Sequence, residues 1–125
     1  MMTGIVTAKR EAILRVTVCA DNGRTYDYDA LIDTGYNGTF TLPPSIIAAL
    51  GLRWFRYNAS MLADGTEITY DVYEGVLLWD GQPTPILIDE MNSDSLIGMS
   101  LMAGYELNLP VRNGATFTLR PIPNP

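Results

Sequence analysis

The chain has no histidine and a single cysteine, and these shortages remove most of the common catalytic systems. Without histidine, neither a Ser-His-Asp triad nor a Cys-His pair can form within the chain. A zinc site built from nitrogen and sulfur ligands is not expected either, since only Cys19 could contribute a ligand of that kind. We therefore expect no metal and no cofactor, and carboxylates remain as the side chains for polar catalysis.

Long apolar runs and clusters of positive charge are also missing. No apolar stretch approaches the roughly 20 residues that span a bilayer, and the first residues lack the basic and apolar segments of a secretory signal. Fourteen acidic residues outnumber eight basic ones, and Lys9-Arg10 is the only adjacent basic pair. Nucleic-acid binding needs a clustered positive patch, so we expect no nucleic-acid partner. Since a membrane-spanning run and a secretory signal are also missing, we expect a cytoplasmic protein that does not bind a membrane.

What is present suffices for one folded domain over residues 1–125. A chain of 125 residues with 47% hydrophobic and 18% charged residues can bury a single core. Cys19 lies in an alternating apolar stretch and has no second cysteine with which to form a disulfide in the chain. That position predicts a buried, reduced thiol.

Alternating apolar and polar residues predict that most of the chain is β-strand. The alternation at 14–18 and the stretch 25–32 are separated by Asn22-Gly23, a pair that favours a hairpin turn. A second, longer hairpin is predicted from an extended segment at 52–61, a turn at 63–66 and a strand that follows it. Shorter strands are predicted at 39–42, 85–88, 105–109 and 115–119.

Two short helices complete the predicted architecture. Residues 43–51 combine prolines in a first turn with a closing Gly51, and 99–104 end in Gly104. The prolines in 121–125 predict a tail that cannot pair continuously in a sheet. The expected fold is all-β, a closed, barrel-like domain with one or two short helices and a core that covers about 12–120.

Asp33-Thr34-Gly35 directly follows the apolar run 30–32, so it places a carboxylate on a tight loop after a buried strand. Taken alone, the triplet is typical of a polar turn, because Asp and Gly both favour turns. Two later segments change that interpretation. Asp64-Gly65 marks the tip of the longer hairpin, and Leu96-Ile97-Gly98 leads into the second predicted helix.

The triplet, the hairpin with a glycine at its tip and the apolar-apolar-glycine segment, in this order, resemble the retropepsin-like aspartic proteases. The closer likeness is to the small prokaryotic single-domain members, in which a run like that from Asp33 to Gly38 continues into Thr41-Leu42-Pro43. The resemblance covers about 12–120. It implies the retropepsin (acid protease) fold.

The resemblance also implies roles for individual residues. Asp33 would be the catalytic carboxylate, Thr34 would hydrogen-bond across a dimer, and Gly35 would let backbones approach closely. The positions implied to contact substrate are Tyr36 and Asn37 after the triplet, the hairpin tip Ala63, Asp64, Gly65 and Thr66, and Ile97 beneath the loop. Viral members usually have a small residue and then an aspartate where Tyr36 and Asn37 stand.

A single Asp33 cannot act as base and acid at once in peptide hydrolysis. Two carboxylates at hydrogen-bonding distance can, because they cannot both ionise and so retain one proton. The chain holds no second such triplet, which predicts a homodimer with one Asp33 from each subunit. Viral members form a sheet between subunits from their chain ends, and this resemblance implies 115–119 as the strand in that role.

The expected function is that of an aspartic endopeptidase acting on a peptide or protein substrate through a water activated by the two Asp33 carboxylates. One alternative is a non-proteolytic peptide-binding or dimerisation module on the same fold, since fold does not determine function. A glycoside hydrolase is a weaker alternative, because no second carboxylate partner for Asp33 is evident from the spacing.

Overall fold

The computed structural model describes residues 1–124 and is mostly β, as the sequence predicts. Its strands are β1 (Met2–Val6), β2 (Ala12–Cys19), β3 (Thr25–Ile32), β4 (Phe40–Leu42), β5 (Arg53–Met61), β6 (Glu67–Trp79), β7 (Gln82–Glu90), β8 (Leu96–Ile97), β9 (Tyr105–Asn108) and β10 (Thr116–Pro121). The helices are α1 (Pro44–Leu50) and α2 (Met99–Met102).

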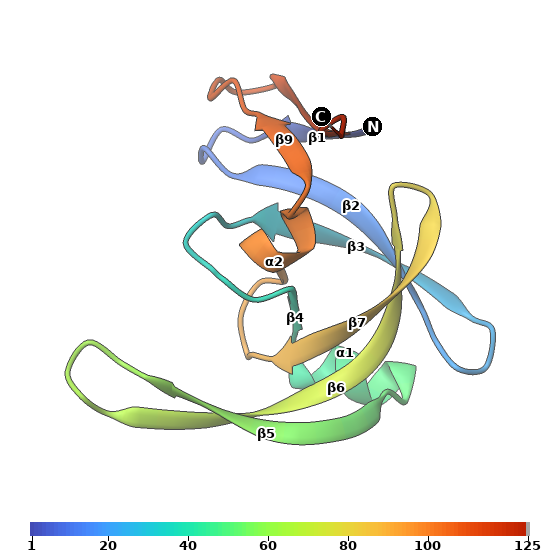
Figure 1. The fold of residues 1–125 in the computed structure, drawn as a ribbon, viewed down its shortest axis with the longest axis vertical. Coiled ribbons are helices and arrows are strands. Elements are labelled where there is room, and N and C mark those ends of the chain that lie inside the picture. Colours follow the sequence, from blue (N-terminus) through green and yellow to red (C-terminus); the bar gives the residue numbers. More distant parts are fainter. Residues whose placement is uncertain (125) are drawn as a thin grey trace.

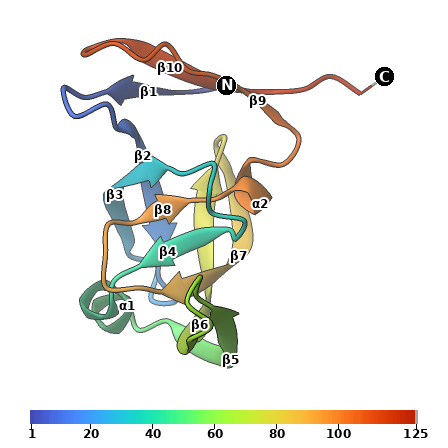
Figure 2. The ribbon, with the colours of Figure 1, turned by 90° about the vertical axis from the view of Figure 1, so that its left-hand side faces the viewer.

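All these strands belong to one sheet in the order β5-β6-β7-β4-β8-β3-β2-β1-β10-β9. β6 also pairs with β2, so the pairings of β2, β3, β8, β4, β7 and β6 return to their starting strand. The strands β1, β10 and β9 lie at one end of the molecule, and the β5–β6 hairpin lies at the other (Figures 1 and 2).

The core is built by strand alternation. In β2, Leu14, Val16 and Val18 are exposed by 4% or less, while the residues between them face outward. The same alternation places Cys19 on the outer face, so its thiol is free but half-buried, and the prediction of a buried thiol was wrong. The following side chains from the other strands are fully buried in the same core: Phe40, Leu42, Leu77, Ile88 and Ile97.

Helix α1 begins and ends close to the predicted residues. Pro43 is its extended N-cap, and Gly51 ends it in the left-handed conformation at φ 63°. Ile47 and Leu50 are buried on the face that meets the core. The helix therefore closes the core between β4 and β5.

Both ends of the chain are more ordered than predicted. β1 precedes the predicted core at 12–120 and pairs with both β10 and β2. Its inward positions are Val6 and Gly4, and an added Cβ at Gly4 would lie 2.2 Å from the Phe117 ring. Apolar alternation does not reveal such a strand. β10 continues to Pro121, which pairs with Tyr105, so the tail predicted at 121–125 begins one residue later; its last residue, 125, lies outside the described residues.

The strand predicted for an inter-subunit sheet also pairs within the chain. β10 pairs with β1 along one edge and with β9 along the other. Within residues 1–124, the pairing with β9 covers Thr118 to Pro121 and leaves Thr116 and Phe117 without a partner on that edge, so the expected role of 115–119 stays a prediction. The strands at the two ends of the sheet order are β5 and β9.

Candidate functional site

Asp33 is the first residue after β3, and the neighbouring backbone holds it on both sides. β3 runs parallel to β8 with Ile32 opposite Ile97, and the Asp33 N–H donates to the Ile97 carbonyl at 2.9 Å. The Gly35 N–H donates to Asp33 Oδ1 at 2.9 Å. The half-buried carboxylate is therefore held in place by the loop itself.

The loop 33–39 is fastened to the segment that begins α2. The Gly98 N–H donates to the Thr39 carbonyl at 3.0 Å, and the Met99 N–H donates to the Tyr36 carbonyl at 2.8 Å. Ser100 adds two bonds, from its N–H to the Gly38 carbonyl at 3.1 Å and from its hydroxyl to the Asn37 carbonyl. The structure thus brings the triplet and the predicted 96–98 segment together.

The Ile97 side chain lies in the core rather than at the surface. It is 0% exposed, so its expected role in substrate binding was wrong. What Ile97 contributes is its carbonyl, which accepts the Asp33 N–H. The parallel pairing of β3 with β8 turns that side chain inward beneath the loop.

Gly98 is required by a close approach of two backbone segments. An added Cβ at this position would lie 2.1 Å from the Gly38 carbonyl oxygen and 2.7 Å from Tyr36 Cδ2. Backbone atoms at such a distance cannot yield as a flexible side chain could. A larger residue at position 98 would therefore push the loop away from α2.

We expect Gly98→Ala to lower the free energy of unfolding by on the order of 2 kcal/mol, as overpacking of a tight contact does. The measurement is urea denaturation. Gly114→Ala is the matched control, because Gly114 has φ 82° and open space around it. An alanine there meets no neighbouring atom, so its loss of about 1 kcal/mol reflects only the strain of a left-handed backbone. Equal losses in the two variants would contradict the close approach.

A groove of about 430 Å³ lies beside the loop. Residues 35–39 of the loop form one wall, and strands of the sheet form the other. The strand residues that line it are Arg56, Asn58 and Ser60 of β5, Tyr70 and Val72 of β6, and Leu87 and Asp89 of β7. Figure 1 shows the loop after β3 and the tip of the β5–β6 hairpin on the same side of the molecule.

Tyr36 ties the loop to the sheet across this groove. Its ring packs so closely over Gly38 that a Cβ there would lie 2.3 Å from the hydroxyl oxygen, and that hydroxyl donates to Asp89 Oδ2. Burial, followed by the bond to Asp89, raises the pKa of Tyr36 far above its ordinary value, so the hydroxyl stays a donor. Burial also raises the pKa of Asp89, although the Tyr36 bond and the Arg56 charge oppose that rise.

The predicted hairpin tip is present, but it does not line the groove. Ala63 and Gly65 lie in a turn in which Gly65 has φ 87°, and Asp64 Oδ1 accepts the Thr66 N–H at 2.9 Å. Hydrogen bonding from Thr66 lowers the pKa of Asp64. The groove is lined by the hairpin's strands, while the four tip residues lie beyond its walls.

Sequence reasoning therefore missed Arg56, Asn58, Ser60 and Asp89. A signal for the first three was present, because polar residues alternate with Tyr57, Ala59 and Met61 along β5. For Asp89 no local signal exists. Asp89 lies outside the strand predicted at 85–88, whereas β7 extends to Glu90.

Thr34 is exposed, and its hydroxyl forms no hydrogen bond within residues 1–124. Two hollows lined largely by apolar side chains lie on this part of the surface. Thr34, Met99 and Leu107 help to line one hollow of about 250 Å³. Ile32, Leu109 and Val111 help to line another of about 190 Å³. Thr34 thus borders one hollow, and the other lies beside Ile32, the residue before the triplet.

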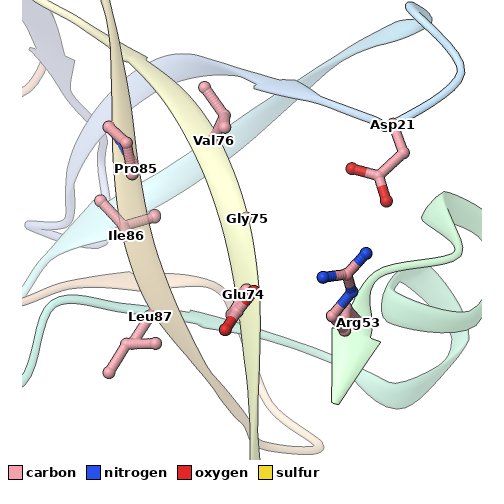
Figure 3. Close-up of a pocket in the computed structure, with 8 residues that line it drawn as sticks. All are labelled: Asp21, Arg53, Glu74, Gly75, Val76, Pro85, Ile86 and Leu87. Atoms are coloured by element: carbon pink, nitrogen blue, oxygen red, sulfur yellow. The ribbon is translucent and has the colours of Figure 1, made fainter. Parts of the chain in front are cut away.

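A cavity of about 460 Å³ lies away from Asp33, between the β2–β3 turn and the strands β5, β6 and β7. Figure 3 shows the Asp21 carboxylate and the Arg53 guanidinium turned toward each other beside it. Glu74 and the run from Pro85 to Leu87 complete its lining. Neither the triplet nor its loop contributes to this cavity.

Within residues 1–124, no three His, Cys, Asp or Glu side chains gather closely enough to hold a metal ion. Neither α1 nor α2 has the length and apolar character needed to cross a membrane.

Comparison with known proteins adds no assignment. No family model matches the chain, and no curated protein matches it. The residues around Asp33 and the groove beside them are therefore what supports a function.

Proposed function

We propose that the protein is a homodimeric aspartic endopeptidase with a closed, barrel-like retropepsin fold. The observation that carries the proposal is Asp33, a carboxylate held on a tight loop by the Ile97 carbonyl and the Gly35 N–H. The loop that holds Asp33 lines a groove with its residues 35–39, and a long β-hairpin borders that groove. A carboxylate held rigidly on the loop that forms one wall of a groove is suited to proton transfer.

The strand pairings support the fold assignment. β2, β3, β8, β4, β7 and β6 form a closed circuit of pairings, as a small barrel requires. β8 pairs in parallel with β3 and antiparallel with β4, so it lies between the strands that precede and follow the triplet's loop. This placement supports the loop from below, which is the role the family resemblance implies for 96–98.

In the proposed reaction, the two Asp33 carboxylates of the dimer share one proton because like charges at hydrogen-bonding distance cannot both ionise. The ionised carboxylate takes a proton from water as that water attacks the peptide carbonyl. The protonated carboxylate donates to the carbonyl oxygen and leaves a tetrahedral intermediate. The first carboxyl then gives its proton to the amide nitrogen while the second, now ionised, takes a proton from one hydroxyl of the intermediate. The C–N bond breaks, releasing an amine and a carboxylic acid and leaving one proton on the pair.

An exposed apolar face around Thr34 supports the dimer. Met99 is 47% exposed, Leu109 36% and Val111 61%, and they border the two hollows that flank the triplet. A second copy that brings its Asp33 to the first would cover this face. Burial of the face contributes about 25 cal/mol per Å² of apolar surface removed from water.

The proposal is tested by cleavage of a peptide library at mildly acidic pH in the presence and absence of a statine-type inhibitor. We expect cleavage that the inhibitor stops, because a statine hydroxyl mimics the tetrahedral intermediate bound between the carboxylates. Mass spectrometry of the products reports the cleaved bonds. A protein that neither cleaves the library nor binds the inhibitor is not an aspartic peptidase.

The alternative is a peptide-binding module that does not cleave. Tyr36 favours it, because its ring fills space beside the triplet and its hydroxyl is bound to Asp89. The library experiment separates the two functions, since the module would retain peptides intact.

A further inference from the structure

Three residues of the groove form one row across adjacent strands. Arg56 of β5 pairs with Val72 of β6, and Val72 pairs with Asp89 of β7. Directly paired residues of antiparallel strands point to the same face of a sheet. A cation and an anion therefore face the groove from two strands apart, about 10 Å at the backbone, with Val72 between them.

A β-bulge gives Arg56 this orientation. The pairing of β5 with β6 shifts between Trp54 and Arg56, where Phe55 is the extra residue. Without that shift, Arg56, Asn58 and Ser60 would face away from the groove, because strand neighbours alternate. The bulge thus turns the polar side of β5 onto the groove and leaves Tyr57 outside.

Neither charge of the row is neutralised by an ion pair. Within residues 1–124, the ion pairs involve neither Arg56 nor Asp89, and the Arg56 guanidinium lies 5.3 Å from the centre of the Phe55 ring. Tyr36 binds Oδ2 of Asp89, and Oδ1 has no hydrogen bond from another described residue. A donor for Oδ1 and an acceptor for Arg56 are left to a ligand.

We propose that this row is a specificity subsite for the uncharged amide side chain of a glutamine or asparagine in an extended peptide. The amide NH₂ donates to Asp89 and the amide carbonyl accepts from Arg56. Asn58 and Ser60, on the same face of β5, add further polar atoms beside the amide. The inference rests on the proposed function in that it takes the groove to hold a peptide.

Other side chains fit the row less well. A lysine would be attracted by Asp89 but repelled by Arg56. A glutamate would be attracted by Arg56 but repelled by Asp89. Either would also lose the hydration of a full charge on entering the groove. A leucine would leave both charged groups without the hydrogen bonds that water had supplied, which carries a penalty for each. An amide can hydrogen-bond to both groups, and it loses less hydration than a charged side chain does.

The test is selection from a pool of peptides randomised in their central positions, with Asp33→Asn protein at neutral pH so that bound peptides stay intact. Mass spectrometry of the bound fraction reports the preferred residue at each position. We expect glutamine and asparagine to exceed leucine by about tenfold at one position, as hydrogen bonds to charged groups imply. Enrichment of leucine or phenylalanine at every position, or no retention of peptides, would overturn the subsite.

Charge-removing variants sharpen the test. In the Asp33→Asn background, Asp89→Asn leaves Arg56 as the charged group and should move the preference to glutamate and aspartate. Arg56→Gln should move it to lysine and arginine. The matched controls Asp94→Asn and Arg53→Gln remove the same charges outside the groove and should change nothing. If Asp89→Asn and Arg56→Gln leave the residue preference unchanged, the proposal is contradicted.

The subsite and the peptidase can fail separately. Cleavage by the wild-type protein with no amide preference in either assay would leave the peptidase standing and remove the subsite. Selection that follows the variants as expected, from a wild-type protein that never cleaves, would support the subsite and remove the peptidase.

Discussion

Asp33→Asn is expected to lower peptide cleavage by at least roughly a thousandfold, because both the base and the acid of the dyad are lost. The fold should survive, since an asparagine oxygen can still accept the Gly35 N–H that Asp33 Oδ1 accepts. Cleavage is followed by mass spectrometry and the fold by circular dichroism. Asp94→Asn, in an exposed loop before β8, is the matched control and should cleave normally.

Mixed dimers test whether the two copies of Asp33 act together. When wild-type and Asp33→Asn chains are unfolded and refolded together in equal amounts, random pairing makes about one quarter of the dimers fully wild type. If each site needs both carboxylates, activity should fall to that fraction. Activity that falls to about half would mean that each subunit carries a complete site, and the shared dyad would be wrong.

Met99→Glu is expected to abolish both dimer formation and cleavage. Met99 is 47% exposed in the single chain and borders the hollow beside Thr34, so a second copy would bury it. An unpaired buried carboxylate costs on the order of 3 kcal/mol, and two-fold symmetry buries two of them, so the dissociation constant should rise by on the order of 10⁴-fold. Analytical ultracentrifugation measures it.

The control for this variant is Ala49→Glu, which places the same charge on an exposed position of α1. It should leave both association and cleavage unchanged. A Met99→Glu protein that is monomeric and fully active would contradict the two-copy site. One that remains dimeric and active would instead show that the apolar face around Thr34 is not the interface.

Much of the local structure is predictable from neighbouring residues. The period-two alternation locates β2 and β3, and Asn22-Gly23 places the turn between them, where Gly23 has φ 82°. Proline at the start and Gly51 at the end bound α1. The triplet's position directly after a strand is likewise local. These predictions were confirmed because each depends on conformational preferences over a few residues.

The misplaced or missed features depend on contacts between distant segments. Sequence patterning does not locate β1 because Gly4 stands at one of its two inward positions, and only the Phe117 ring packed against Gly4 explains that glycine. The inward turn of Ile97 and the use of both edges of β10 follow from strand pairings that local sequence does not encode. The burial of Cys19 could not be predicted for the same reason, because the packing of the whole sheet decides which face of β2 turns inward.

By itself, the sequence determined that this protein is built from strands and that a carboxylate follows one of them on a tight loop. Tertiary structure decided what surrounds that carboxylate. Asp89 reaches Tyr36 across 53 residues of chain, and a bulge at Phe55 turns Arg56 toward the same groove. Turn and strand preferences act between neighbours in sequence, whereas register and bulges are set by which strands pair, and pairing is a property of the folded sheet.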